Sequence, residues 1–480
     1  MYLGIDIGTS GVKAVVMAGD GAIAAQHTAP LTVSRPHQLW SEQDPAHWWS
    51  ATQAAVMALP AELRRAVRAA GITGQMHGAV LLGADDKVLR PAMLWNDGRS
   101  FAECAELEAA EPGTRAITGN IAMPGFTAPK LLWVSHHQPE LFAEIRKVLL
   151  PKDYVRLLMT GEHASDMSDS AGTLWLDTGS RDWSDAMLAA TGLARAQMPK
   201  LHEGCEVTGR LRSDVAGDWG MDPIAVVAGG GDNAAGAAGV GVTGDGDALL
   251  SLGTSGVIFV ATGEFRPNPD RAVHAFCHCL PGMWHQMSVH LSAASCVDWA
   301  AGATRLAGPA AVFAAAEAAG AASGPELFLP FLSGERTPHN DPHLRAGFLD
   351  LDNDSDAGRM AAAVLEGVAF AHADGLDALR EAGTRLEELA VIGGGARSRF
   401  WGEILAAVLD VRLRYLDGGE VGPALGAAKL AQMADTGMSA AQACASPPVH
   451  EVIEPDPLLA ERLAPKRARF RRAVAAIRSL

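Results

Sequence analysis

The stretch that decides the fold is Asp6-Ile7-Gly8-Thr9-Ser10-Gly11-Val12-Lys13, and its central five residues, Gly-Thr-Ser-Gly-Val, recur letter for letter at 253–257. Apolar runs typical of β-strands flank both copies, at 2–7 and 12–17 around the first and at 248–252 and 257–261 around the second. Each copy therefore predicts a Gly-rich turn between two strands. This differs from a P-loop, which ends in Gly-Lys-Ser/Thr and opens a helix.

A third strand is predicted after each copy, because Gly19-Asp20-Gly21 and Pro281-Gly282 favour tight hairpin turns. Helical segments follow, and the first opens at Asp44-Pro45 with an aspartate cap and a proline at the first helical position. Farther along the chain, helices alternate with strands. The sequence therefore predicts an α/β protein with mixed sheets covered by helices.

The repeat also predicts how the chain is divided. Two copies of one strand-turn-strand unit indicate two related lobes that face each other across a central cleft. Residues 241–247, Gly-Val-Thr-Gly-Asp-Gly-Asp, favour neither helix nor strand. We therefore expect an N-terminal lobe at 1–243 and a C-terminal lobe at 244–480.

The repeated turn contains the residue types that bind phosphate. Its glycines let the backbone approach phosphate oxygens closely, and the hydroxyl groups of Thr9, Ser10 and Thr254 can donate to those oxygens together with the turn amides. Asp6, at the end of a strand, can hold a magnesium ion through water. One such turn alone is as typical of an ordinary Gly-rich hairpin as of a phosphate site. A nucleotide held between two lobes, however, needs a turn from each side, and the sequence has two.

Two further Gly-rich segments are candidate sites. Gly229-Gly230-Gly231-Asp232-Asn233 follows an apolar run, and a carboxylate at the end of a buried strand can meet a substrate hydroxyl, so Asp232 is a candidate general base. Taken alone, Gly-Asp-Asn is more often simply a turn. The segment 393–398 follows a predicted strand and precedes a helix, which suits backbone contact with adenosine or its α-phosphate at a helix N-terminus.

The composition excludes several classes of function. The chain has 480 residues and a formal net charge of −16, so we expect binding neither to nucleic acid nor to an anionic membrane surface. No apolar run is long enough to span a bilayer, and the start has no basic segment followed by an apolar one. We expect a cytoplasmic protein with reduced cysteines and a small-molecule ligand.

Two patterns resemble metal sites without the required residues. On a strand, His274 and 277–279 would place the two thiols on one face and the histidine between them on the other. The aspartates within 350–356 mimic a calcium loop, but Ser355 stands where a glycine makes the turn and Ala361 where a glutamate closes it. We expect a metal at neither place, and a solvated helix start at the second.

The order of these elements resembles that of the actin-like ATPase (ribonuclease H-like) fold. Two further segments resemble the signatures of the FGGY carbohydrate kinase family: 123–133, Met-Pro-Gly-Phe-Thr-Ala-Pro-Lys-Leu-Leu-Trp, is similar to the first signature and 347–367 to the second. Asp350 is a departure, because the family generally has a glycine there. The resemblance covers nearly the whole chain.

Within the family, Gly74-Gln75-Met76-His77-Gly78 resembles the hallmark of the branch that phosphorylates D-xylulose, and so do 40–45 and 94–99. The resemblance implies ATP-dependent phosphorylation of D-xylulose to D-xylulose 5-phosphate, with Mg²⁺ as a cofactor. A related kinase acting on L-ribulose, gluconate or a pentitol is the alternative, because pocket specificity can depend on one or two side chains.

The same resemblance implies roles for individual residues. Met76, His77, Asp232 and Asn233 would contact the sugar, Asp232 would act as general base, and Asp6 and Asp232 would hold the magnesium ion through water. The residues implied to line the ATP site are Gly8, Thr9, Ser10, Lys13, Gly253, Thr254, Gly394, Gly395 and Ser398. Asp97 and Arg99 fit either the cleft or a mutual ion pair, and a homodimer is expected because family members are often dimers.

Two other classes of function compete with this interpretation. An actin-like chaperone or filament protein would share both phosphate turns, but it should also have a peptide-binding or polymer-contact region, and we find no appended domain. A catalytically silent sugar sensor would be expected to have lost its base or one turn. Asp6, Asp232 and both turns are present.

Overall fold

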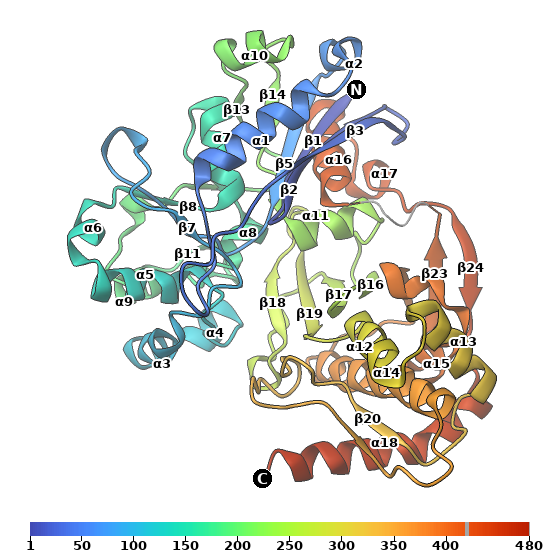
Figure 1. The fold of residues 1–480 in the computed structure, drawn as a ribbon. Coiled ribbons are helices and arrows are strands. Elements are labelled where there is room, and N and C mark those ends of the chain that lie inside the picture. Colours follow the sequence, from blue (N-terminus) through green and yellow to red (C-terminus); the bar gives the residue numbers. More distant parts are fainter. Residues whose placement is uncertain (418–421, 480) are drawn as a thin grey trace.

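The computed structural model describes residues 1–417 and 422–479 and has two α/β lobes. In Figure 1 the lobes lie one above the other, with the N-terminus in the upper lobe and the C-terminus at the foot of the lower one. Each lobe is built around a mixed sheet of seven strands. The prediction of two α/β lobes of the actin-like type is confirmed.

The first sheet has the strand order β13-β14-β5-β1-β2-β3, with β15 also paired to β5. Its strands are β1 (Tyr2–Ile7), β2 (Gly11–Met17), β3 (Ile23–Pro30), β5 (Ala69–Gly74), β13 (Val207–Arg210), β14 (Ala225–Val227) and β15 (Gly230–Gly231). Three helices pack on one face around a shared apolar core: α1 (Pro45–Met57), α7 (Pro151–Thr160) and α10 (Ser213–Trp219). Helix α1 begins as predicted, because the Asp44 side chain accepts a hydrogen bond from the amide of Ala46 at 2.9 Å.

The other face is covered by α11 (Asp232–Gly239) and by α16 (Pro423–Thr436), which comes from the end of the chain. Although α16 follows the predicted division at residue 243, it lies beside the first sheet in Figure 1. A Cβ atom on Gly4 would lie 1.8 Å from the Ala424 carbonyl oxygen, and one on Gly71 would lie 2.0 Å from that of Ala427. Only glycine permits this approach, so α16 is fixed directly against the strands that lead to the cleft.

The second sheet repeats the arrangement of the first. Its order is β18-β19-β17-β16-β22-β23-β24, with bounds β16 (Ala248–Leu252), β17 (Gly256–Thr262), β18 (His274–Cys277), β19 (Trp284–His290), β22 (Glu388–Ile392), β23 (Arg412–Leu416) and β24 (Val449–Ile453). Strands β16, β17 and β19 form an antiparallel meander like β1, β2 and β3, and β22 runs parallel to β16 as β5 does to β1. The repeated turn in the sequence therefore marks a duplicated lobe.

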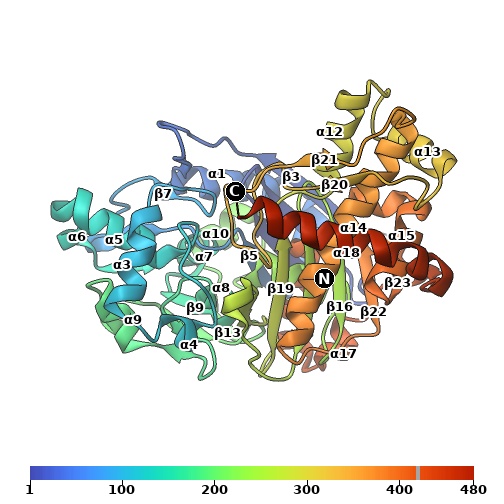
Figure 2. The same ribbon diagram turned by 90° about the horizontal axis from the view of Figure 1, so that it is seen from below.

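The core of the second lobe surrounds one long buried helix, α14 (Ala357–Glu381). The helices around it are α12 (Ala294–Thr304), α13 (Pro309–Ala319), α15 (Arg399–Leu409) and α18 (Pro457–Ile477). Viewed from below, α18 crosses in front of α14 (Figure 2). The shorter elements of this lobe are η3 (Pro269–Arg271), β20 (Leu327–Leu329), β21 (Gly347–Leu349), η4 (Gly394–Arg397) and α17 (Ala440–Ala443).

Between β5 and β13 the first lobe carries a mainly helical extension, which lies at the left in Figures 1 and 2. Its helices include α3 (Phe101–Ala110), α4 (Thr114–Thr118), α5 (Thr127–His137), α6 (Pro139–Glu144), α8 (Met167–Ala171) and α9 (Asp185–Ala190). Its short strands are β6 (Val80–Leu82), β7 (Ala92–Met93), β8 (Lys147–Leu149), β9 (Ala164–Asp166), β10 (Leu176–Asp177), β11 (Asp182–Trp183) and β12 (Lys200–His202), and β4 (Glu42–Gln43) pairs with β7. The Asn120 side chain donates to the Ala275 carbonyl at 2.8 Å, which joins this extension to the second lobe.

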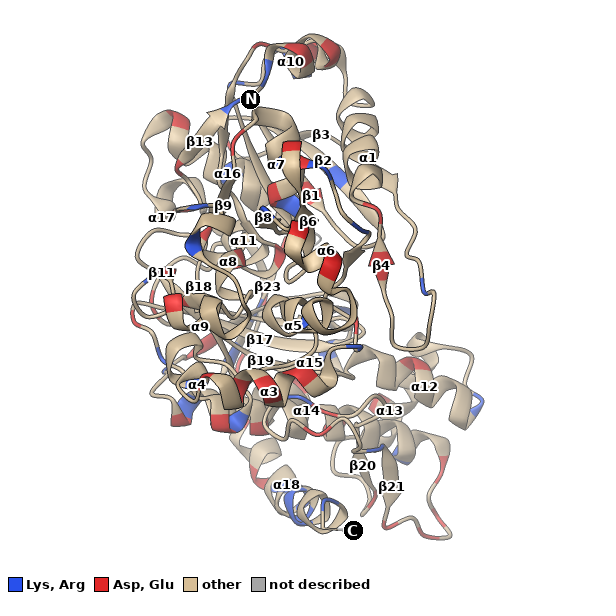
Figure 3. Cartoon of the chain, turned by 90° about the vertical axis from the view of Figure 1, so that its left-hand side faces the viewer, with Lys and Arg blue, Asp and Glu red and all other residues tan. Residues whose placement is uncertain are grey.

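Charged residues of both signs are scattered over the side seen in Figure 3, and the lysines and arginines in this view are most concentrated on α18. Arg467 and Arg471 on that helix pair with Asp374 and Asp377 of α14. Among the described residues, no helix is long and apolar enough to cross a membrane, and no group of three or more His, Cys, Asp or Glu side chains could hold a metal ion. The predicted cytoplasmic location and homodimer stay predictions.

Candidate active site

The first predicted phosphate turn closes the hairpin between β1 and β2. The Gly8 amide donates to the Gly11 carbonyl at 3.0 Å, and Asp6 at the end of β1 lies opposite Lys13 on β2. The Thr9 hydroxyl donates to Gln75 Oε1 at 3.1 Å and accepts from the Trp95 indole at 3.0 Å. Ser10 is exposed. The Thr9 side chain therefore joins the turn to the residue after β5 and to the segment that contains Trp95.

Met76 and His77 lie beside this turn because β5 runs parallel to β1. The Gln75 amide donates to the Ile7 carbonyl at 2.9 Å. His77 has the left-handed backbone conformation, with φ of 68°, and its Nδ1 lies 2.6 Å from the Gly172 carbonyl oxygen. A carbonyl can only accept, so Nδ1 carries the proton and Nε2 is left as an acceptor. Burial lowers the pKa of His77 to about 3, which makes this ring neutral near pH 7.

Asp232 is brought to the same place by β15. This short strand pairs with the end of β5, so that a Cβ atom on Gly231 would lie 3.0 Å from Met76 Sδ. Asp232 then opens α11, and its Oδ1 accepts from the Asn233 amide at 2.8 Å and from Asn233 Nδ2 at 3.0 Å. The structure thus brings together four of the predicted sugar-site residues.

The two candidate catalytic carboxyl groups have raised pKa values. Burial, reinforced by the negative charge of Asp232, raises the pKa of Asp6 to about 7, although Lys13 opposes the shift. Burial raises the pKa of Asp232 to about 6, against the effect of the hydrogen bonds from the Asn233 and Asp232 amides. Asp6 Oδ1 is also buried without a hydrogen-bond partner. A cation between these carboxylates would remove both penalties.

The second turn, between β16 and β17, is supported by the start of α12. The Thr254 carbonyl accepts from the Ala293 amide at 2.9 Å and from the Ser295 hydroxyl at 2.8 Å. The third Gly-rich segment lies against the same strand end, since a Cβ atom on Gly395 would be 2.8 Å from that of Leu252. Gly253 and the 393–398 segment are therefore neighbours, as an ATP site requires.

Within the third segment, the predicted residues differ in accessibility. Gly394 is exposed, and a Cβ atom there would meet nothing within 4 Å. Gly395 and Ser398 are buried, and the Ser398 hydroxyl accepts from the Trp401 amide at 3.2 Å as the cap of α15. Gly394 is therefore the open contact point of this segment, whereas Ser398 orients the helix behind it.

Aromatic rings from both lobes form a wall beside His77. The Phe126 ring lies edge-on to His77, with centroids 4.8 Å apart, and Phe126 meets Phe276 of the second lobe at 6.1 Å. Phe276 in turn stacks on His274 at 5.5 Å. No hydrogen bond joins the first phosphate turn to the second within 1–417 and 422–479, so the lobes themselves set the distance between the turns.

Comparison with known proteins decides what this site belongs to. Residues 1–239 match the N-terminal domain of the FGGY family of carbohydrate kinases, and residues 248–434 match its C-terminal domain. The chain belongs to the FGGY family of carbohydrate kinases. It is therefore an enzyme that phosphorylates a carbohydrate, with ATP as the phosphate donor as in the rest of the family.

The chain is similar to several xylulose kinases over nearly its full length. It is 55% identical to that of Escherichia coli (strain K12), with 98% of each chain covered, and 35% identical to that of Bacillus subtilis (strain 168), with 94% of this chain and 91% of the other covered. The crystal structure of xylulose kinase from Rhodospirillum rubrum has a TM-score of 0.93 at 28% identity, covering 100% of this chain and 99% of that one.

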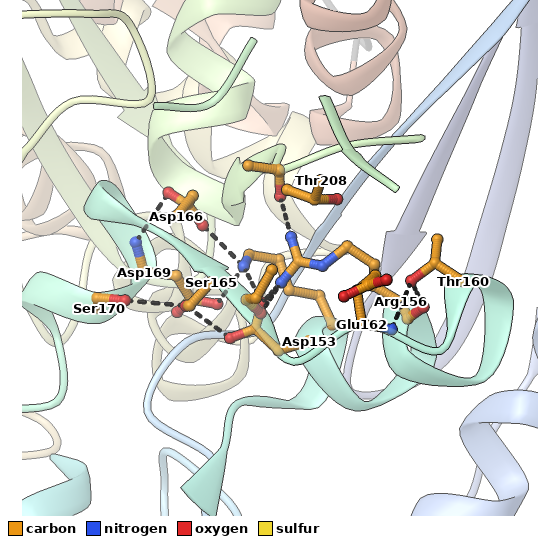
Figure 4. Close-up of polar contacts among 12 residues, drawn as sticks. Asp153, Arg156, Thr160, Glu162, Ser165, Asp166, Asp169, Ser170 and Thr208 are labelled. Atoms are coloured by element: carbon orange, nitrogen blue, oxygen red, sulfur yellow. Dashed lines mark hydrogen bonds and ion pairs between the residues drawn. The ribbon is translucent and has the colours of Figure 1, made fainter. Parts of the chain in front are cut away.

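Behind the candidate sugar site, the FGGY kinase has a fully buried cluster of charged residues (Figure 4). Lys152 Nζ lies 2.6 Å from Asp153 Oδ1, 2.7 Å from Asp166 Oδ1 and 3.4 Å from Asp169 Oδ2. Arg156 adds a second cation, with Nη2 2.5 Å from Asp153 Oδ1. Burial raises the pKa of Asp169 well above its usual range, and the charge of Lys152 opposes this shift. The cluster thus sets two basic side chains among three acidic ones.

This cluster is connected to both sides of the sugar site through α8. The Ser168 hydroxyl donates to Asp166 Oδ2 at 2.5 Å and accepts from the Gly231 amide at 3.0 Å, directly before Asp232. The carbonyl group of Gly172, the residue after α8, accepts a hydrogen bond from His77 Nδ1. Arg156 also donates to the Ala228 carbonyl at 2.9 Å, at the end of β14. One buried unit therefore positions the candidate base and the candidate sugar ligand.

Asp97 and Arg99 form a structural ion pair. Arg99 Nη2 lies 2.6 Å from Asp97 Oδ2 and 2.7 Å from Glu42 Oε1, and the guanidinium carbon lies 3.6 Å from the centroid of the Trp40 ring. Both side chains are buried. Of the two expectations for this pair, the mutual ion pair is the one observed, and Arg99 is enclosed too fully to reach a substrate.

Asp350, which replaces the usual glycine of the second family signature, has a φ of 59°. This left-handed conformation explains a glycine preference, and aspartate is one of the few other residues that adopt it readily. Its side chain pairs with Arg469 on the surface. The departure therefore leaves the local backbone in the form that a glycine would take.

Two residues beside the candidate site were missed by the sequence analysis. Lys130, inside the first signature, donates to the carbonyls of His77 at 2.8 Å and Gly125 at 2.7 Å, and burial lowers its pKa to about 7. Trp95 is about half exposed and contacts the first phosphate turn. Both lie in segments that the analysis quoted, so the family signatures were the signal, but neither segment indicates which side chain faces the site.

Proposed function

We propose that this kinase transfers the γ-phosphoryl group of ATP to the terminal C5 hydroxyl of D-xylulose. The observation that carries the proposal is the placement of His77, a neutral ring with a free Nε2 acceptor, and of Met76 beside Asp232. Relatives that are named xylulose kinases match over the whole chain and support the choice of sugar. His77 Nε2 would accept a hydrogen bond from a sugar hydroxyl, and Asp232 would contact the hydroxyl that is phosphorylated.

Asp232 acts as the general base in this mechanism. Phosphoryl transfer passes through a loose transition state, so the attacking hydroxyl loses its proton late and a carboxylate of ordinary strength suffices. The pKa of about 6 leaves Asp232 mainly ionised at pH 7. Asn233 donates from Nδ2 to Asp232 Oδ1 at 3.0 Å, which would keep the carboxylate oriented, and Asn233 would itself contact the sugar.

Mg²⁺ fits the pair formed by Asp6 and Asp232. Asp6 Oδ1 is buried without a hydrogen-bond partner, and each carboxyl has a raised pKa that a cation would lower. Carboxylates that hold Mg²⁺ largely through water are typical of ATP-dependent phosphotransferases. When bound, the ion would neutralise charge on the phosphate oxygens. Asp6 would hold its water ligands, and Lys13 across the hairpin would add a positive charge beside the phosphates.

The ATP site uses both turns and the third Gly-rich segment. The amides of Thr9 and Ser10 would contact the γ-phosphate, and those of Gly253, Thr254 and Gly394 the rest of the nucleotide. Closing of the lobes would bring the two substrates together and exclude water, which limits hydrolysis of ATP.

The experiment that tests this proposal is an ADP-release assay with Mg-ATP against D-xylulose, L-ribulose, D-ribulose, gluconate, glycerol and pentitols. We expect kcat/KM for D-xylulose to be the highest in the set. A higher value for another sugar would keep the kinase mechanism and replace the substrate. No turnover with any of them would contradict the proposal and favour a sensor.

The two raised pKa values predict where activity is lost in acid. Both carboxyls must be ionised to act, so kcat/KM should fall as pH decreases from 7 through 6, rather than near pH 4 as for exposed aspartates. Rates measured between about pH 5 and pH 8 at two Mg²⁺ concentrations test this. A higher Mg²⁺ concentration should shift to lower pH the part of the acid-side decrease in kcat/KM that is due to Asp6. A kcat/KM that stays constant down to about pH 5 would contradict the assignment.

The buried cluster predicts a positioning effect of Ser168. The Ser168→Ala change leaves the Gly231 amide buried without its acceptor at 3.0 Å, and Asp232 follows directly. We expect kcat to fall roughly tenfold, with KM for ATP unchanged, because an unsatisfied buried amide costs about 1–3 kcal/mol and is relieved by movement of the backbone.

Ser170→Ala is the matched control for this change. Ser170 is equally buried on the same helix, but its hydroxyl donates at 2.8 Å to Ser165, away from Asp232. Both variants should lose similar thermal stability, and only Ser168→Ala should lose kcat. Equal losses of kcat in the two variants would mean that the cluster acts on stability alone.

A further inference from the structure

Arg336 lies in the loop that follows β20. Burial lowers the pKa of its guanidinium group, and the negative charge of the neighbouring Glu335 opposes this shift. The residue is partly exposed, and no carboxylate in the described part of the chain lies within ion-pairing distance of its guanidinium group. The neighbouring Glu335 is directed elsewhere: its oxygens accept from His290 at 3.2 Å, from the Leu291 amide at 3.1 Å and from the Arg336 amide at 2.8 Å. An arginine held this way has donors available for a ligand.

The backbone around Arg336 is rigidly fixed to the second sheet. The Thr337 amide donates to the Val289 carbonyl at 3.0 Å, and the Val289 amide donates to the Thr337 hydroxyl at 3.0 Å. That hydroxyl also donates to the Ala272 carbonyl at 2.8 Å. Arg336 is therefore presented from a defined position rather than from a mobile loop, as expected of a preorganised binding group.

The side chain points toward the sugar site of the other lobe. Nη1 lies 3.3 Å from His274 Nε2, and His274 Nδ1 lies 3.1 Å from Asn120 Oδ1. The His274 ring stacks on Phe276 and lies edge-on to Phe126, which contacts His77 at 4.8 Å. Arg336 thus stands at the end of the ring wall that faces His77, and only one of its donors is used by His274.

The side chain of Arg336 contacts His274 of the ring wall rather than Asp232. Its positive charge contributes to the lowered pKa values of His77 and His274, after burial as the main cause. The pKa of Asp232 is set instead by burial and by backbone amides. With the C5 hydroxyl at Asp232, the carbon 1 end of a five-carbon sugar would be directed toward the guanidinium group.

We infer that Arg336 is a sugar-binding residue supplied by the second lobe. Its guanidinium group donates hydrogen bonds to the oxygens at the C1–C2 end of the substrate, and it can bind a carboxylate at the same place. This rests on the proposed function for the direction of the sugar. A ketose offers its carbonyl and hydroxyl oxygens, whereas a five-carbon aldonate offers a carboxylate that matches the planar guanidinium bidentately. Aldonates should therefore be competitive inhibitors of this kinase.

The test compares D-xylonate with xylitol, which has the same configuration and a neutral C1. Calorimetric titration in the absence of ATP should show D-xylonate binding roughly tenfold to hundredfold more tightly than xylitol, as for a charge-assisted pair. In Arg336→Gln this preference should disappear. KM for the ketose should rise by a smaller factor, roughly severalfold to tenfold, because its oxygens are neutral acceptors, while KM for ATP and ATP hydrolysis without sugar stay unchanged.

Arg345→Gln is the matched control, because Arg345 is exposed, lies in the same loop region, and donates to the carbonyls of Pro342 and Leu344 at 2.7 Å. It should keep the preference for D-xylonate. Arg336→Lys, which keeps the charge without the planar fork, should retain part of it. If Arg336→Gln does not fold, the affinities of the wild type and of Arg336→Lys for D-xylonate and xylitol still test the inference.

Equal affinity of the wild type for D-xylonate and xylitol, or an unchanged preference in Arg336→Gln, would overturn the inference. Failure of the proposed function is distinguishable, because the titrations require no turnover. If another sugar proves to be the substrate, the KM comparison is made with that sugar, and a KM that is the same in both proteins counts against Arg336.

Discussion

Replacing Asp232 by alanine is expected to lower kcat by a factor of about 10² to 10⁴, while the KM for ATP stays close to that of the wild type. The carboxyl group lies at the first residue of α11, beside Met76 and next to the charge of Asp6. No other carboxylate in the described part of the chain is placed at the end of β15, so the loss has no substitute. Initial rates at saturating sugar and nucleotide measure it.

The effect on catalysis must be separated from an effect on folding, because Asp232 Oδ1 also accepts a hydrogen bond from the Asn233 amide at 2.8 Å at the start of a helix. Asp232→Asn keeps an acceptor there and removes the base. We expect its kcat to be as low as that of the alanine variant, with a melting temperature near that of the wild type. An asparagine variant with nearly normal kcat would remove Asp232 from the role of base.

The sequence predicted the fold through local patterns that the structure preserves. The repeated turn marks two hairpins with matching sheet order, and Asp44-Pro45 begins α1 as expected. These signals are short in range, because a turn or a cap depends on residues that are adjacent in the chain. The position of α16 could not be predicted in this way, since Gly4 and Gly71 meet the backbone of α16 and Gly426 meets that of α11 from distant parts of the chain.

The candidate site was predictable to the extent that its residues lie in recognisable motifs. Asp6, His77 and Asp232 meet because β1, β5 and β15 are neighbours, and each strand end carries its motif. Lys152, Asp153 and Arg156 gave no signal, because charged residues at these spacings on a helix are typical of a solvated face. Their burial is a property of the assembled lobe, and so is the approach of Arg336 to His274.

Asp6 should be the second most sensitive position. Asp6→Asn is isosteric and keeps an oxygen toward the cleft, but it removes the charge that a metal ion requires. We expect kcat to fall by about 10² or more, because charge stabilisation by a bound metal supplies several kcal/mol in such reactions. The Mg²⁺ concentration needed for half-maximal rate should rise in the same variant, which a titration of rate against Mg²⁺ at fixed ATP measures.

The direction of the pKa change distinguishes a metal ligand from a residue that merely supports the turn. The charge of Asp232 raises the pKa of Asp6, and Lys13 opposes this from across the hairpin. Asp6→Asn should therefore remove the part of the acid limb near pH 7 and leave the part near pH 6 that belongs to Asp232. Lys13→Met is the matched change on the partner strand, and it should move the Asp6 limb to higher pH because the stabilising cation is lost. An Asp6→Asn enzyme with an unchanged Mg²⁺ requirement and an unchanged limb would show that Asp6 acts only on the structure of the turn.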